Sequence, residues 1–432
     1  MSTRVIAGIA CLFVSMFVSP IDAQADTVGQ LWPGFRGIGG NGHAVDAHPP
    51  VSWSAADGKN VLWKTAIARH GMSSPVVVGK RLFVTAADHV VRQVLCYDTD
   101  TGKLVWEHGV DSVAGEDLPR VLDETGYAAP TAVTNGDLVA AMFATGELVC
   151  VNVEGNRVWE KQLGVPKNHY GHASSLARFE SLVIVQVDQE EDARLLAFDF
   201  ASGKPVWQVE RDAMSWSSPI VIDNNGRMEV ILTNSKCVDS YDPKTGTHLW
   251  RVDCIDGEVA PSAAYADGVA FVASEGATAT AIALGKHDPE PKILWQWAES
   301  LPDSASPLAT KQYLILPTAF GLVTCLNAKN GEVYWEHEYD RGFSSSPILV
   351  NDCVYLADLS GTMQIFRMGK EFEHVGEGSI GEAVYATPAF VGDRIYIRGV
   401  AHLFCIANQE KADGDVPNFT SPPSNQKDTV PR

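Results

Sequence analysis

An internal repeat constrains this chain more than any other feature of its sequence. The phrase "SSPVVVGKRLFVTAADHVVRQVLCYDTDTGKLVWEHG", from Ser73, recurs as "AAPTAVTNGDLVAAMFATGELVCVNVEGNRVWEKQLG" from Ala128. Further copies start at positions 173, 217, 260, 305, 345 and 386, and one anchor position aligns them all: Pro75, Pro130, Ser175, Pro219, Pro261, Pro307, Pro347 and Pro388. A repeat of this length cannot bury its apolar face alone, so the copies must pack on one another.

Each copy has the pattern of four short strands. In the first copy, residues 75–78, 81–86, 94–97 and 103–106 are apolar runs separated by Gly, Asp and Thr turn signals. Four-stranded units repeated four to eight times are typical of a β-propeller. Residues 60–408 divide into eight units of about 44 residues. We therefore expect an all-β, eight-bladed β-propeller of four-stranded antiparallel blades.

The two ends of the repeated region are complementary. The last copy, "TPAFVGDRIYIRGVAHLFCIAN", stops after three strands, whereas "NVLWKTAIA" at 60–68 resembles a single fourth strand that carries Trp63. We expect residues 60–67 to be the outer strand of the blade formed by residues 386–408. This N-terminal strand would join the C-terminal blade, close the ring and remove two open sheet edges.

The segments that flank the repeats have different characters. Residues 1–25 combine Arg4, an apolar run too short to span a bilayer and an Ala-Gln-Ala sequence, which predicts a signal peptide cleaved after Ala25. Residues 26–59 form a glycine-rich lead-in, which we expect across one face of the propeller (60–408). The G-x-G-x-x-G in this lead-in opens no helix, so it predicts no nucleotide site. Residues 409–432 are polar and Pro-rich, which predicts a disordered tail.

The charge and the cysteines narrow the function. The formal net charge is −20, which argues against nucleic acid or acidic lipid as a partner. No later apolar run reaches the length of a transmembrane span. After the signal peptide, seven scattered cysteines remain, and they form no disulfide framework. We expect an exported protein, periplasmic or extracellular, that is a monomer without a transmembrane span.

Three positions within the repeat have structural interpretations. A tryptophan on the outermost strand should fill the gap to the next blade, with its N–H bonded to a carbonyl. Asp or Asn in the preceding turn should cap that turn rather than bind metal, and the cysteines should occupy a slot for small residues. The tryptophans are Trp106, Trp159, Trp207, Trp250, Trp295 and Trp335; the turn residues are Asp98, Asn152, Asp199, Asp242 and Asn327; the cysteines are Cys96, Cys150, Cys325 and Cys405.

The repeat resembles a known family. The segments "CYDTDTGKLVW", "AFDFASGKPVW" and "SYDPKTGTHLW" are similar to the repeats of pyrroloquinoline-quinone (PQQ)-like propellers, a quinoprotein-like relative of WD40 repeats. The lead-in "WPGFRGIGGNG" resembles the opening of exported bacterial members. The resemblance implies the fold over residues 32–408, but function has to be argued from the site.

The resemblance implies two alternative functions. One branch of the family, similar to the outer-membrane assembly factor BamB, consists of non-catalytic scaffolds that bind protein partners at the cell envelope, commonly as lipoproteins. The other branch consists of quinoprotein dehydrogenases that hold PQQ and calcium at the ring axis, with an adjacent cysteine pair. No such pair and no calcium-ligand set match here, so we expect a BamB-like scaffold without cofactor. A dehydrogenase with PQQ and calcium, or a propeller that binds carbohydrate or another small ligand, is the alternative.

The residues just before each anchor should surround the channel mouth, where aromatic and ionisable groups form a candidate binding surface. Neither a nucleophile motif nor a complete metal-ligand set is present, because His169 and His172 lack a third ligand. No catalytic residue and no metal site are therefore assigned. The candidate binding residues are His70, Met72, Tyr127, His169, Tyr170, His172, Trp216, Glu258, Asp303, Arg341, Phe343 and Tyr385.

Overall fold

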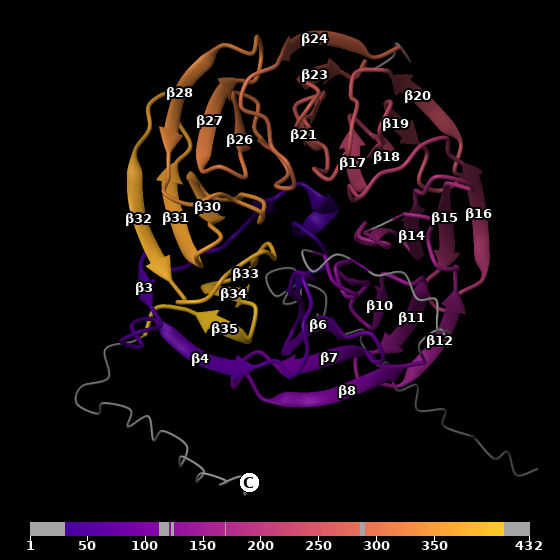
Figure 1. Ribbon diagram of the computed structural model, residues 1–432, viewed down its shortest axis with the longest axis vertical. Helices are drawn as coiled ribbons and strands as arrows, with labels where there is room; N and C mark the ends of the chain where they lie inside the picture. Colours follow the sequence, from indigo (N-terminus) through magenta and orange to yellow (C-terminus); the bar gives the residue numbers. More distant parts are fainter. Residues whose placement is uncertain (1–30, 112–120, 122–124, 169, 286–289, 410–432) are drawn as a thin grey trace, which may run out of the picture.

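The computed structural model describes residues 31–111, 121, 125–168, 170–285 and 290–409, and these form eight β-sheets around a central axis (Figure 1). The sheets are the eight predicted blades. Blades 1 to 4 consist of β5 (Val76–Val78), β6 (Arg81–Ala87), β7 (Arg92–Asp98) and β8 (Leu104–Val110); β9 (Val133–Thr134), β10 (Leu138–Met142), β11 (Glu147–Asn152) and β12 (Arg157–Gln162); β13 (Ala177–Phe179), β14 (Leu182–Val187), β15 (Arg194–Asp199) and β16 (Pro205–Glu210); and β17 (Ile220–Asn224), β18 (Arg227–Thr233), β19 (Val238–Tyr241) and β20 (His248–Val252).

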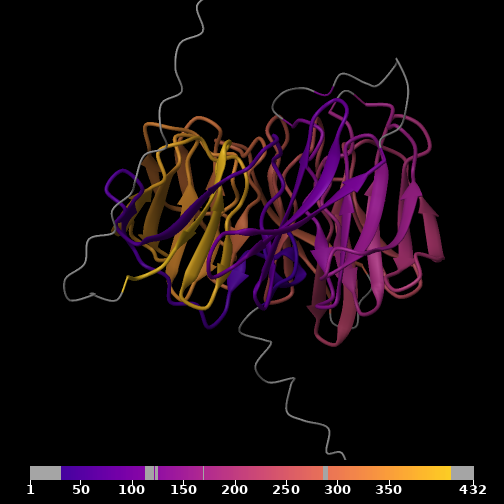
Figure 2. The same cartoon turned by 90° about the horizontal axis from the view of Figure 1, so that it is seen from below.

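The second half of the ring repeats the same four-stranded antiparallel order from the axis outward. Blades 5 to 8 consist of β21 (Ala264–Ala266), β22 (Val269–Val272), β23 (Ala279–Ala283) and β24 (Lys292–Trp297); β25 (Leu308–Ala309), β26 (Tyr313–Pro317), β27 (Leu322–Asn327) and β28 (Val333–Glu338); β29 (Ile348–Val350), β30 (Cys353–Ala357), β31 (Thr362–Arg367) and β32 (His374–Ser379); and β33 (Ala389–Val391), β34 (Arg394–Arg398), β35 (His402–Ile406) and β4 (Val61–Ala66). Figure 2 shows the ring from the side, with the strands running between its two ends.

The ring closes as the sequence predicts. Strand β4 pairs antiparallel with β35, so that Trp63 lies opposite Cys405 and Lys64 opposite Phe404. In Figure 1 the indigo β4 therefore lies beside the yellow β35, although the two are far apart in the sequence. The first and last blade strands thus share one sheet, and neither leaves an unpaired edge inside the ring.

The predicted packing of the repeated tryptophans against the next blade is confirmed in most blades. The indole of Trp63 donates its N–H to Thr99 O at 2.9 Å, and a Cβ on Gly102 would lie 2.6 Å from the Trp63 ring. Gly102 therefore has to be glycine, because its φ of 66° and this ring leave no room for a side chain. The same N–H bond to a carbonyl of the next blade is made by Trp106, Trp159, Trp207, Trp295 and Trp335.

Two blades depart from this pattern. In blade 4, Trp250 donates its N–H to the Glu229 carboxylate of its own blade at 2.7 Å, rather than to a carbonyl. In blade 7, Gly376 occupies the tryptophan position opposite Ile365. The indole of Trp53, from the lead-in, lies over the neighbouring Gly378, where a Cβ would be 2.1 Å from the ring. The lead-in thus supplies the aromatic side chain that blade 7 lacks.

The small-residue slot and the turn caps are also confirmed. Cys96, Cys150, Cys325 and Cys405 are fully buried free thiols, each directly opposite the tryptophan of its blade. Burial raises the pKa of each of these thiols to about 12, which makes them poor nucleophiles. In the turns, one Asp98 carboxylate oxygen accepts hydrogen bonds from the N–H groups of residues 100 and 101.

The lead-in crosses one end of the ring, hereafter the lead-in end, as the indigo segment at the centre of Figure 1. It adds β1 (Leu31–Trp32) to blade 1, and β2 (His43–Ala44) and β3 (Trp53–Ser54) to blade 7. Strands β2 and β3 pair parallel to β29 and β32, an addition that the repeat does not predict. The G-x-G-x-x-G follows β1 and enters only a three-residue 3-10 turn, η2 (Ile38–Gly40).

The described residues contain no helix that is long and apolar enough to cross a membrane. The predicted signal peptide, the predicted disordered tail beyond residue 409 and His169 lie outside the described residues.

Candidate functional site

A ring of hydroxyl side chains lines the axis, and it corrects the register that the prolines suggest. Seven backbone N–H groups of this ring each donate to the hydroxyl oxygen of the next blade, at 2.8–3.1 Å. The recorded steps run from Ser74 through Thr131, Ser175, Ser218, Ser262, Ser306 and Ser346 to Thr387. In blades 2 and 5 the hydroxyl follows the anchor proline, whereas in most other blades it precedes that proline.

A second ring lies two positions before the hydroxyls and forms a small cup. The cup has a volume of about 170 Å³, and Phe35 from the lead-in also lines it. Side chains at alternate positions of an extended strand face the same side, which explains why both rings point to the axis. The residues of the second ring are Met72, Ala129, Ala173, Trp216, Ala260, Ser304, Ser344 and Tyr385. We call this end of the ring the mouth end.

The structure brings some of the candidate residues together at the mouth end. Met72, Trp216 and Tyr385 line the cup itself. The ring of Tyr170 packs edge-on against Trp216, with centroids 5.0 Å apart, and the Tyr170 hydroxyl donates to Glu258 Oε2 at 3.3 Å. These contacts join the segments that enter blades 3, 4 and 5.

Other candidate residues lie away from the cup. The Tyr127 ring packs under the Arg92 guanidinium, 4.6 Å from its centroid, between blades 1 and 2. His172 is buried, with Nε2 3.3 Å from Gly164 O, and burial lowers its pKa to about 4. The buried Phe343 ring packs 5.6 Å from that of Tyr339 in the core beside blade 6.

Three candidate residues are exposed at this end outside the cup. His70 lies beside Gly126, where a Cβ would be 3.0 Å from its Nδ1. Asp303 is exposed on the segment that enters blade 6. Arg341 lines a separate polar hollow of about 820 Å³, together with Asp358 and Glu377 of blade 7.

Sequence reasoning missed the small residues of the cup and one exposed aromatic side chain. Tyr127, His172 and Glu258 are one or two positions away from the slots that Ala129, Ala173 and Ala260 fill. The signal that could have placed them is the spacing of the hydroxyl residues, 44, 43, 44, 44, 40 and 41 after the longer first step of 57.

The hairpin between β26 and β27 carries the missed aromatic residue, Phe320, which is 76% exposed. This hairpin lies at the mouth end, because Thr318 O accepts the N–H of Phe343 from the segment that enters blade 7. The corresponding hairpins of blades 1 and 8 expose Val90, at 59%, and Val400, at 40%. The mouth end therefore presents apolar side chains on loops around a shallow cup.

The cup does not fit a quinone cofactor with its calcium ion. Calcium requires several oxygen ligands, usually including carboxylates, and PQQ itself carries carboxylates that need cationic partners. The residues that line the cup are Ser, Thr, Ala, Met and aromatic residues, without a carboxylate or a guanidinium. Across the part of the chain that the structure describes, no group of three His, Cys, Asp or Glu residues is placed to hold a metal ion.

Comparison with known proteins gives a consistent result. A family model described as outer membrane protein assembly factor BamB matches residues 44–225 and 284–396, more than half of the chain. A curated protein named outer membrane protein assembly factor BamB, from Burkholderia pseudomallei, is 26% identical over 209 residues. That alignment covers 46% of this chain and 48% of the relative, so the chain matches about half of the relative's length.

Two solved structures share the fold. BamB from Moraxella catarrhalis superposes with a TM-score of 0.60 at 14% identity, covering 82% of this chain and 99% of that structure. The quinohemoprotein alcohol dehydrogenase of Comamonas testosteroni gives a TM-score of 0.63 at 13% identity, covering 91% of this chain and 82% of that structure. At such identities both likenesses establish the architecture alone.

Proposed function

Because this chain belongs to the family of outer membrane protein assembly factor BamB, we propose that it is a non-catalytic, exported scaffold that binds a partner protein of the cell envelope at the mouth end of its ring. Its relatives are named for assembly at the outer membrane, which supports an envelope location. The scaffold needs no cofactor, and it acts as a monomer.

The exposed side chain of Phe320 is the observation that carries the proposal. Exposing an aromatic side chain to water is unfavourable, and this one is 76% exposed. Covering it with a partner removes apolar surface from water and so lowers the free energy of the complex. Buried aromatic anchors dominate protein–protein binding energies. Val90 and Val400 are further exposed apolar side chains at the same end, on the loops of blades 1 and 8.

The surroundings of Phe320 describe the partner. The cup, at about 170 Å³, is below the roughly 300–1,000 Å³ that small-molecule pockets occupy, so we place binding on the loops around it. Phe320 lines a further hollow of about 430 Å³ beside Glu275. Glu258, Glu275 and Asp303 are exposed at the mouth end. The partner should therefore present an apolar pocket for Phe320 with basic side chains around it.

A capture experiment with matched variants tests the proposal. The purified chain, immobilised at micromolar concentration, is exposed to envelope extract, and each captured protein is quantified for wild type, Phe320→Asp and Val206→Asp. Val206 is 50% exposed on the outer strand β16, so its variant adds the same charge far from the mouth. We expect a partner that Val206→Asp retains and that Phe320→Asp loses by about tenfold or more.

Two results would contradict the proposal. One is the absence of any protein that wild type captures and Phe320→Asp loses. The other is reduction by alcohols or sugars of a dye in the presence of added PQQ and Ca²⁺, with loss of activity on Glu258→Ala or Asp303→Ala, which would establish the dehydrogenase instead.

A further inference from the structure

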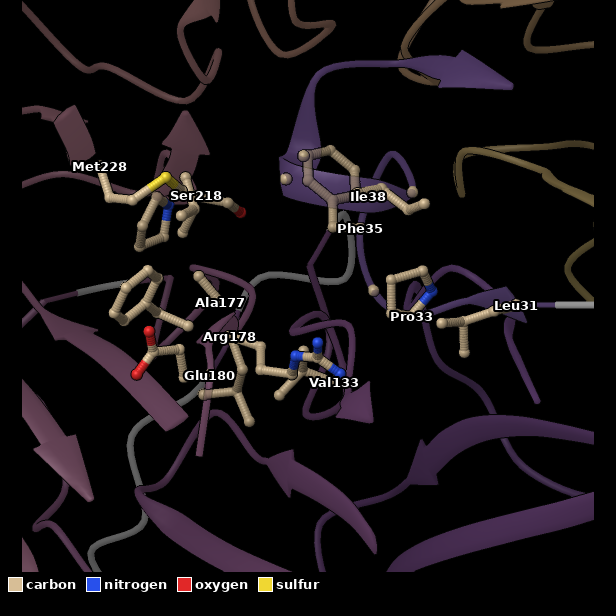
Figure 3. A pocket seen from close by; sticks show the side chains of 18 residues that line it. Leu31, Pro33, Phe35, Ile38, Val133, Ala177, Arg178, Glu180, Ser218 and Met228 are labelled. Atoms are coloured by element: carbon tan, nitrogen blue, oxygen red, sulfur yellow. The ribbon is translucent and has the colours of Figure 1, made fainter. Parts of the chain in front are cut away.

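A second cavity lies at the lead-in end of the ring, opposite the proposed protein-binding surface. It has a volume of about 400 Å³ and lies between the lead-in and the inner hairpins of blades 2, 3 and 4. Figure 3 shows Phe35 and Ile38 of the lead-in on one side and Ala177 and Met228 on the other. We call it the lead-in pocket. Its size is within the range of small-molecule sites, whereas the cup is smaller.

Glycines in the lead-in make this pocket possible. A Cβ on Gly39 would lie 2.5 Å from Val221 O of blade 4, so only glycine lets the lead-in approach that strand. Gly37 has a φ of 78°, and a Cβ there would lie 2.9 Å from the Trp32 ring. The glycine-rich motif therefore fixes an arch over the hairpins, and the space under the arch is the pocket.

The pocket is mostly apolar, with one cationic side chain and one exposed carboxylate, that of Glu180, in its lining. Leu31, Pro33, Phe35 and Val133 contribute hydrophobic surface to its wall. Such a wall favours a ligand with an aliphatic chain or an aromatic ring, because apolar surface is removed from water on both partners. The cation is Arg178 of β13.

Arg178 is placed to meet an anion. Among the described residues, its guanidinium makes one hydrogen bond, from Nη1 to Thr134 O at 3.4 Å, and pairs with no carboxylate. Figure 3 shows the guanidinium extending toward Val133, whereas the Glu180 carboxylate points away from it. Burial lowers the pKa of Arg178, the direction expected for a partly desolvated cation without an acidic partner.

The contrast with Arg211 supports this interpretation. Arg211 is fully buried between blades 3 and 4, and it pairs with Asp188 at 2.8 Å and Asp239 at 3.1 Å. A buried cation normally has such partners, since leaving it unpaired is costly. Arg36 and Arg398 are also buried without a carboxylate, but each donates to two backbone carbonyls. Arg178 is only partly buried and makes one long bond, to Thr134 O, so its other N–H donors can meet a ligand from outside the chain.

We infer that the lead-in pocket binds a small organic carboxylate with an apolar body, its carboxylate on Arg178 and its chain or ring against Phe35, Val133 and Met228. A guanidinium and a carboxylate form charge-assisted hydrogen bonds with a matching planar geometry. Phe35 and Ser218 line both this pocket and the cup, but Arg178 and the arch belong to the pocket alone, and the site does not depend on the proposed protein-binding function.

Calorimetric titration of the full chain with two probes tests the inference. The probes are 4-phenylbutyrate and 4-phenylbutanol, which share the apolar body and differ in the carboxylate. We expect saturable binding of the acid below about 1 mM, and a preference for the acid over the alcohol of about tenfold. In Arg178→Gln the preference should fall below about twofold while binding of the alcohol is retained.

A second set of variants locates the site without altering a buried residue. Ile38 is 55% exposed at the rim, so substitutions there should leave folding intact. Ile38→Glu should weaken the acid more than the alcohol, Ile38→Lys should strengthen the acid, and Ile38→Gln should change the preference little. Tyr385→Ala, which alters the cup, should leave both affinities unchanged.

Several outcomes would overturn the inference. The first two are equal affinity of wild type for the acid and the alcohol, and no saturable binding of the acid at millimolar concentration. The third is an affinity for the acid that changes in Tyr385→Ala but not in Arg178→Gln. The fourth is an affinity for the acid that does not change with the charge at position 38. Loss of partner capture in Phe320→Asp, with this preference intact, would show that the two sites are independent.

Discussion

The two ends of the ring use the same blades in different ways. At the mouth end every blade contributes the same backbone position, so the cup is a ring of repeat residues around the axis. At the lead-in end a single non-repeating segment crosses the strands and leaves a pocket under only three blades. The repeat therefore forms the ring of blades, hereafter the frame, and its symmetric cup. The asymmetric, ligand-sized cavity comes from the segment outside the repeat.

The closing strand should have the largest effect, because both ends depend on a closed ring. Trp63→Ala removes an indole that is 8% exposed and donates to Thr99 O. We expect a loss of about 3–5 kcal/mol in the free energy of unfolding, measured by urea denaturation. Leu62→Ala, on the neighbouring residue that is 40% exposed, should change it by about 0.5 kcal/mol or less. Equal effects of the two variants would mean that closure contributes little.

Acid should weaken the mouth end through His172. Burial lowers the pKa of its imidazole to about 4 in the folded chain from 6.5. Because the unfolded chain takes up the proton first, the contribution to stability is complete above pH 6.5 and is lost as the pH falls toward 4. The loss should reach up to about 3 kcal/mol.

Denaturation curves between pH 7 and 4 check this pH dependence. His172→Gln should flatten the profile, whereas His89→Gln, at an exposed position, should leave it as in wild type. A profile that His172→Gln does not change would place the acid sensitivity elsewhere in the ring.

A smaller effect should separate the lead-in end from the frame. Gly39 and Gly79 both have positive φ, at 67° and 53°, but only Gly39 faces a backbone oxygen, Val221 O. Gly39→Ala should cost about 2–3 kcal/mol, and Gly79→Ala about 1 kcal/mol from backbone strain alone. Gly39→Ala should also lower the affinity for 4-phenylbutyrate. Equal stability loss with unchanged affinity would show that the arch does not form the pocket.

The smallest effect on stability should come from the residue proposed to matter most for binding. Phe320→Ser exposes no new core and removes only a side chain that is already in water, so the free energy of unfolding should change by about 0.5 kcal/mol or less. The captured partner should nevertheless be lost. A large destabilisation with partner capture retained would assign Phe320 a structural role.

The sequence predicts the frame because the frame repeats. The closing pair of Trp63 and Cys405 is predicted because the last copy of the repeat lacks its fourth strand. The cysteine and tryptophan positions are predicted because, within a copy, the cysteine precedes the same turn and the tryptophan follows it. The cup is predicted only in part. The sequence suggests proline as the anchor, yet the hydroxyl of residues such as Thr131 and Ser262 holds the constant position, since it bonds to the neighbouring blade.

The lead-in pocket could not be predicted for a different reason. Arg178 lies in a β-strand pattern, where a cation ordinarily faces water, and Phe35 lies in a segment without periodicity. What brings them together is the arch of the lead-in, which depends on glycine φ values and on contacts such as that of Gly39 with Val221. The lead-in does not repeat, so the periodicity that predicts the blades cannot predict where the lead-in packs.

The central claim is that the partner protein binds at the mouth end. The most direct test is hydrogen–deuterium exchange of the chain with and without its captured partner. We predict slower exchange in the hairpins around residues 318–321, 88–91 and 399–402, with unchanged exchange over residues 35–48 of the lead-in. Protection of residues 35–48, with the mouth hairpins unaffected, would contradict the account.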